Sequence, residues 1–315
     1  MATPQDKAQE ALKGIASLIA DAQNDTQISE LFTGKVDESK LEFIINPNVS
    51  LGERPNKSEE GFKTYTFLDK MFLNVIGVSL DGLPFASNAI LTGLPNSGKT
   101  LLVMEVALRV AESGKKVAYV TSEKIFRVDN ARYDLESQMR EMAGTLNLDW
   151  LKIVDNLFVI DTVKFAKLRD WTNFISTYRS LVELKKIDLV LIDSMTLLEE
   201  ARGALKYRVL ELMRYNQTHG LTSIMINQRA IEEADTLAMA GGIALSYAVD
   251  VVMALDYKKV SSWDAQIKLD TGAKQSETVN FFRVLKCSLS KFDAHYKAYE
   301  ITQQGQVKLK DVVQP

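Results

Sequence analysis

The stretch that most constrains this chain is the glycine-punctuated loop GLPNSGKT at residues 93–100. An apolar run, NAILTG (88–93), precedes the loop, and a segment with helical periodicity follows it. Glycines let backbone N–H groups turn inward around an anion, and the positive end of the helix dipole near Lys99 adds to the attraction. A strand, a loop and a helix joined in this way predict an α/β sheet with an anion-binding loop at its edge.

Further apolar runs follow with the spacing of βαβ units. They are KVAYVTSE (116–123), NLFVIDT (156–162), DLVLIDS (188–194), TSIMINQ (222–228) and DVVMALDY (250–257). These runs are continuous instead of alternating, which indicates a sheet covered on both faces. Three segments of the tail predict antiparallel strands with a turn at Gly305: QIKLD (266–270), NFFRVLKCS (280–288) and YKAYEITQQG (296–305). The predicted fold is therefore α/β, with a central, mostly parallel sheet and antiparallel C-terminal strands.

The N-terminal part has a different character. Residues 5–22 carry apolar side chains at three- and four-residue spacing, which predicts an amphipathic helix. Residues 46–61 hold two prolines, two glycines and mixed charges and are typical of a linker. We therefore expect a small helical accessory segment over 1–61 and a core domain over 62–315. The helix has no core of its own, so it docks either on its own domain or on a neighbouring subunit.

Composition excludes several classes of protein. Of the 315 residues, 46% are hydrophobic and 25% are charged, which is ordinary for a soluble globular protein. A net charge of -3 argues against a generally basic nucleic-acid-binding surface, although a local patch stays possible. The single cysteine, Cys287, forms no intramolecular disulfide and predicts a reducing, cytoplasmic compartment. No apolar run reaches 18 residues, so no membrane span is expected.

The loop matches the pattern G-x-x-x-x-G-K-T, which binds nucleoside triphosphates when it lies between a strand and a helix. In such a loop Lys99 places a charge against the terminal phosphates, and the Thr100 hydroxyl binds Mg²⁺. The alternative is a glycine turn that merely links a strand to a helix. The predicted nucleotide-contacting residues of this stretch are Gly93, Leu94, Pro95, Asn96, Ser97, Gly98, Lys99, Thr100 and Leu101.

Three polar residues lie at or next to the ends of other predicted strands. Asp193 ends DLVLIDS, where the carboxyl edge of a parallel sheet forms a crevice, and is a candidate to support the metal. Glu123 follows the strand after the loop helix and is a candidate base for the attacking water. Gln228 ends TSIMINQ and could contact a γ-phosphate. The competing interpretations are a helix cap for Asp193, a solvated glutamate and a loop-capping amide.

The order of these motifs resembles the RecA/RadA/KaiC superfamily of ATPases, and most closely its archaeal RadA-paralogue and KaiC-like branch. GLPFASNAILTGLPNSGKT (82–100) looks like the entry to the ATPase core of that branch. SEKIFR (122–127) and GGIALSYAVDVVMALD (241–256) are similar to two further stretches of the family. The resemblance covers residues 62–310. It implies a RecA-like P-loop core and an enzyme that binds ATP and Mg²⁺.

The resemblance also implies roles for single residues. It makes Glu123 the catalytic acid–base, Lys99 and Thr100 ligands of phosphate and Mg²⁺, Asp193 the support of the metal, and Gln228 a sensor of the γ-phosphate.

Arg127 would stack near the adenine, unless it is simply a surface arginine.

Members of the family assemble as rings or filaments with nucleotide between subunits, which implies a homo-oligomer. In the KaiC branch a Lys-x-Arg motif supplies cations to the γ-phosphate of the neighbour. Here Lys286 fits that motif, but Ser288 stands where the arginine is expected. Lys291 or Arg283 is a weaker candidate to replace that arginine. The departure puts the strength of activation between subunits in doubt.

Two functions stay open. The first is an ATP-hydrolysing RadA paralogue that assists DNA recombination or repair, by acting on single-stranded DNA or on a recombinase. The second is a KaiC-like scaffold or switch that acts on a protein partner. Residues 229–242, equivalent to the second DNA loop of the family, hold three acidic residues, one arginine and no aromatic residue. Single-strand binders combine cations with stacking rings, so this composition favours the second function. The first loop, near 197–208, is more basic and includes Tyr207. A solvated helix face also explains these residues, and the segment is short for a loop that inserts fully. A replicative-type helicase fits less well, since no appended DNA-reading domain is evident.

Overall fold

The structure is a computed structural model that describes residues 60–128, 133–195, 204–228 and 248–310. The described residues belong to one compact unit, residues 58–315, and the fold given below is that of this unit. The N-terminal helix predicted over 5–22, nearly all of the linker and the loop at 229–242 lie outside the described residues. The expected domain boundary at residue 61 stays a prediction.

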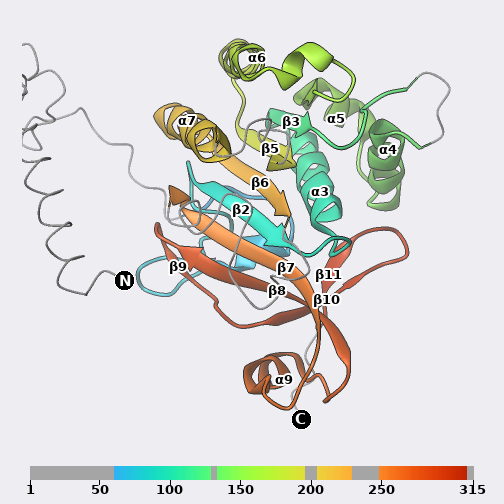
Figure 1. Cartoon of the computed structure of the whole chain (residues 1–315), viewed down its shortest axis with the longest axis vertical. Helices are drawn as coiled ribbons and strands as arrows, with labels where there is room; N and C mark the ends of the chain where they lie inside the picture. The colour runs from blue at the N-terminus through green and yellow to red at the C-terminus, as the bar shows by residue number, and fades with distance from the viewer. Residues whose placement is uncertain (1–59, 129–132, 196–203, 229–247, 311–315) are drawn as a thin grey trace, which may run out of the picture. The chain divides into compact units, whose positions relative to one another are not determined.

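A nine-stranded sheet in the order β11-β10-β8-β7-β2-β6-β5-β3-β4 forms the centre of the described part (Figure 1). The parallel strands are β2 (Asn88–Gly93), β3 (Val117–Thr121), β4 (Leu157–Asp161), β5 (Leu189–Asp193), β6 (Thr222–Gln228) and β7 (Val251–Lys259). The antiparallel strands are β8 (Thr278–Cys287), β10 (Lys297–Ile301) and β11 (Val307–Leu309). Every apolar run predicted to be a strand in the central sheet is one, so the predicted α/β fold is confirmed.

Helices cover both faces of this sheet, and two hydrophobic clusters fill the spaces between the layers (Figure 1). On one face lie α3 (Lys99–Glu112), α4 (Leu135–Thr145) and α5 (Trp150–Asn156); on the other lie α6 (Trp171–Lys185) and α7 (Ala204–Thr218). Successive side chains of a strand point to opposite faces, so Leu191 packs into the first cluster and Ile192 into the second. This double burial explains why the strands are continuously apolar.

The remaining elements are short. The 3-10 helix η2 (Phe67–Lys70) precedes β1 (Phe72–Leu73), which pairs with β9 (Lys291–Phe292) in a separate two-stranded sheet. A second 3-10 helix, η3 (Ala166–Arg169), lies before α6. None of the helices in the described ranges is long and apolar enough to cross a membrane.

The strand predicted over 266–270 is wrong, because these residues form helix α9 (Ala265–Thr271). The apolar residues at 267 and 269 alternate as in a strand, yet Ile267 is buried and Leu269 is 76% exposed. Local turn chemistry decides the outcome: the Asp264 carboxylate accepts the N–H and the hydroxyl of Ser261 at 2.7 Å, and Gly272 ends the helix at φ +69°. The other two tail segments are β8 and β10, and Gly305 turns the chain at φ +78° as predicted.

Strand β2 occupies the middle of the sheet, between β6 and β7. Strands β3, β5 and β6 run parallel to it, so their carboxyl ends meet at one edge. Helix α3 begins at this edge directly after the loop 93–98. Parallel α/β sheets bind their ligands in the crevice outside the carboxyl ends of the strands. The fold thus brings the loop and the three predicted polar residues to the same edge.

Candidate functional site

The glycine-punctuated loop packs closely against two neighbouring strands, and there is no room for a side chain at Gly93. Gly93 has φ +152°, and a Cβ atom there would lie 1.9 Å from the Leu255 carbonyl oxygen. The Leu94 N–H donates to the Asp256 carboxylate at 3.3 Å, and the Tyr299 hydroxyl donates to the Ser97 carbonyl at 2.6 Å. The loop is therefore anchored to β7 on one side and to the C-terminal strand β10 on the other.

Lys99 begins helix α3 and folds its side chain back into the loop. Its ammonium donates to the carbonyls of Gly93 and Leu94, at 2.9 and 2.6 Å, and to the Ser97 hydroxyl at 3.3 Å. The side chain is buried, and these three acceptors are neutral. An ammonium beside the N-terminus of a helix attracts an anion, because the helix dipole adds to its positive charge. The arrangement fits a loop that receives phosphate oxygens.

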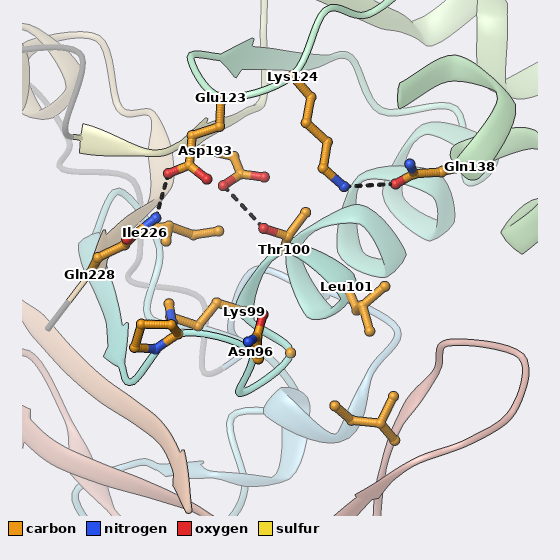
Figure 2. Close-up of a pocket in the computed structure, with 13 residues that line it drawn as sticks. Asn96, Lys99, Thr100, Leu101, Glu123, Lys124, Gln138, Asp193, Ile226 and Gln228 are labelled. Atoms are coloured by element: carbon orange, nitrogen blue, oxygen red, sulfur yellow. Dashed lines mark hydrogen bonds between the residues drawn. The ribbon is translucent and has the colours of Figure 1, made fainter. Parts of the chain in front are cut away.

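Asp193 lies at the end of β5 and faces the first turn of α3 (Figure 2). Thr100 donates to one of its carboxylate oxygens at 3.3 Å, and the buried Tyr119 hydroxyl donates to the other at 2.9 Å. Burial raises the pKa of Asp193 and the Glu123 charge adds to this, whereas the hydrogen bonds from Tyr119 and Thr100 oppose the shift. A cation next to this carboxylate would stabilise its charged form.

Glu123, two residues beyond the end of β3, accepts two hydrogen bonds on one oxygen. The Gln228 amide donates to its Oε1 at 2.6 Å, and the Ser194 hydroxyl donates to the same atom at 2.6 Å (Figure 2). Ser194 is itself fixed, because its N–H donates to the Ser122 hydroxyl at 2.8 Å. The carboxylate is thus oriented by residues from the ends of β5 and β6 while it stays exposed to solvent.

These groups surround a cavity of about 380 Å³. Its lining comprises Pro95, Asn96, Gly98, Lys99, Thr100, Leu101, Glu123, Lys124, Gln138, Asp193, Ile226, Gln228 and Ile301. Most residues predicted to contact nucleotide or metal therefore lie around one space. Gly93, Leu94 and Ser97 belong to the same loop but are not part of the lining, and they bond to the Lys99 ammonium instead.

Two predicted residues lie elsewhere. Arg127 forms an ion pair with Glu136 of α4, and its carbonyl accepts the Lys164 ammonium at 3.0 Å. It is not among the residues that line the cavity, so its stacking role stays a prediction. Lys286 lies on β8 and donates to the Val249 carbonyl at 2.7 Å. It too lies outside the lining, and its expected action on a neighbouring subunit stays a prediction.

Several residues of the site were not predicted. Ser194 directly follows Asp193, and Lys124 directly follows Glu123. Their position next to a candidate residue is the one feature of the sequence that could have marked them as part of the site. Tyr299 lies 202 positions from Ser97, and no local pattern marks it. Gln138, Ile226 and Ile301 complete the unpredicted part of the lining.

The site also fits Mg²⁺. No group of three or more His, Cys, Asp or Glu side chains within the described ranges could enclose a metal ion. Mg²⁺ does not need such a group, because it is usually held by one or two carboxylates together with substrate phosphates and water. Asp193 and the Thr100 hydroxyl, which lie within hydrogen-bond distance at the cavity, are the residues that would hold it.

Comparison with known proteins identifies the fold and the family. The family model described as "ATPase: KaiC" matches residues 62–311. Among solved structures, a KaiC-like protein from the hyperthermophilic archaeon Pyrococcus horikoshii OT3 superposes with a TM-score of 0.59 at 17% identity, over 80% of this chain and 99% of that chain. At this identity the likeness concerns the fold. A search of curated proteins returned no match. Because the family model spans well over half of its length, the chain belongs to the KaiC family of ATPases.

Proposed function

We propose that this protein hydrolyses ATP in a reaction that depends on Mg²⁺. The observation that carries the proposal is the convergence of Lys99, the Thr100–Asp193 pair and the Glu123 carboxylate on one cavity of about 380 Å³. Each group has a separate task in phosphoryl transfer: charge neutralisation, metal support and activation of water. The family assignment, which concerns an ATPase, agrees with this set of groups.

In the proposed reaction the loop N–H groups and the Lys99 ammonium bind the phosphates. Mg²⁺, when bound, neutralises charge on the phosphate oxygens. Glu123 accepts a proton from the attacking water, because it is an exposed carboxylate on the cavity wall. The Gln228 amide donates to Glu123 at 2.6 Å and so links the base to the end of β6. That link gives Gln228 a means of reporting the loss of the γ-phosphate.

The test is phosphate release by the purified 315-residue chain with ATP. We expect release with Mg²⁺ and none above background when EDTA removes it. We also expect the rate per chain to be slow, because Ser288 replaces the arginine expected to act on the neighbour. The rate should still rise with protein concentration, because assembly would bring Lys286 to the site of the neighbour. If phosphate release with Mg²⁺ did not exceed the background at any protein concentration, the proposal would be contradicted.

For the downstream role we favour action on a protein partner over direct action on DNA. Residues 229–242 carry Glu232, Glu233 and Asp235 against the single Arg229, which would repel a phosphate backbone. We therefore expect no retention on immobilised single-stranded DNA with ATP and Mg²⁺ at low salt. Retention that falls steeply as salt rises would instead support the role in DNA recombination or repair.

A further inference from the structure

Lys124 is a cation on the cavity wall that has no role in the reaction proposed above. It follows Glu123 in the chain, lies in the cavity lining and is exposed to solvent. Its carbonyl accepts the Thr121 hydroxyl at 2.6 Å, which fixes the backbone from which the side chain extends. The ammonium donates to the Gln138 side-chain carbonyl at 2.9 Å. Because this hydrogen-bond partner is a neutral amide, an anion would be a stronger partner for the ammonium.

The position of Lys124 differs from that of the other polar groups of the cavity. Figure 2 shows its side chain extending from the Glu123 side toward Gln138 of α4, away from Gln228. Glu123 and Gln228 mark the place of the terminal phosphate in the proposed reaction. Lys124 therefore extends away from the place of the terminal phosphate and toward Gln138.

The charges of the cavity lining indicate what Lys124 could contribute to nucleotide binding. The cavity lining contains two cations, Lys99 and Lys124, and two carboxylates, Glu123 and Asp193. A nucleoside triphosphate with one Mg²⁺ remains anionic, so removal of Lys124 would leave the lining net negative around an anion.

We propose that Lys124 is a second phosphate-binding lysine, which leaves Gln138 and contacts the α- or β-phosphate of the nucleotide bound to its own subunit. This proposal rests on the proposed function. It differs from the expected action of Lys286, because the cation comes from the same chain and serves nucleotide binding, not the hydrolytic step.

The test is calorimetric titration of ADP and of ATP with Mg²⁺ into the full chain and into Lys124→Gln. A charge-assisted hydrogen bond is worth about tenfold or more in affinity, and solvent access to Lys124 favours the low end. We expect the affinity for both nucleotides to fall about tenfold. The KM for ATP should rise by a similar factor, with kcat changed less than about threefold, because ADP and ATP share the contacted phosphates.

Lys124→Arg keeps the charge and should stay within about threefold of the parent. Lys167→Gln removes an exposed lysine outside the cavity and should leave both affinities unchanged. Unaltered affinity in Lys124→Gln, or a loss confined to ATP, would overturn the proposal. A loss in Lys124→Gln that Lys124→Arg does not restore would also overturn it, since the lysine would then merely support the fold. If the parent chain bound neither nucleotide, the proposed function itself would fail first.

Discussion

Glu123→Gln should bind ATP as the parent does and lose turnover by about 10²–10⁴-fold. The amide has the shape of the carboxylate but cannot accept the proton of the attacking water. The Ser194 hydroxyl and the Gln228 amide both donate to Glu123 Oε1 at 2.6 Å, so the position of this group is set by the ends of two other strands. The expected result is thus a loss of chemistry at nearly unchanged affinity.

Single-turnover phosphate release, paired with calorimetric affinity for ATP, measures the two quantities separately. Glu141→Gln is the matched control: it removes an exposed carboxylate of α4 that does not line the cavity, and both quantities should stay at the parent values. Undiminished turnover in Glu123→Gln would move the role of base to another acid.

Lys99→Ala should lose ATP affinity by about tenfold to a hundredfold and hydrolysis together with it. The ammonium is buried within the loop, where a charge-assisted hydrogen bond to phosphate is stronger than at an exposed site. The substitution also removes the donor shared by the Gly93 and Leu94 carbonyls and the Ser97 hydroxyl, so the loop itself loses support. Calorimetry and steady-state phosphate release measure the two losses.

Lys99→Arg is the informative companion, because it keeps the charge while its planar fork does not fit the three acceptors that a compact ammonium reaches. Partial recovery of affinity in Lys99→Arg would assign the loss to charge, and no recovery would assign it to loop geometry. A thermal unfolding midpoint close to that of the parent is needed in both variants for this comparison. If Lys99→Ala hydrolysed ATP as fast as the parent, the site would be misassigned.

Much of the arrangement was predictable from local patterns. The run DLVLIDS is apolar on both faces, and the structure places its end, Asp193, at the carboxyl edge with Thr100. The same reasoning brought Glu123 and Gln228 to one edge, and they form a hydrogen bond there. These predictions hold because a parallel sheet aligns the ends of its strands regardless of loop detail. Their catalytic roles stay predictions until the variants are measured.

The sequence by itself determined the fold class, the glycine-punctuated loop between β2 and α3 and the shared edge, because apolar periodicity and glycine geometry act over a few residues. It misled at 266–270, where alternating apolar residues favour a strand and the turn residues at each end produce helix α9. Only the tertiary structure decided that Tyr299 supports Ser97 and that Lys124 extends to Gln138. Such contacts depend on how separate helices and strands pack in three dimensions, and the local conformational preferences of the residues do not determine that packing.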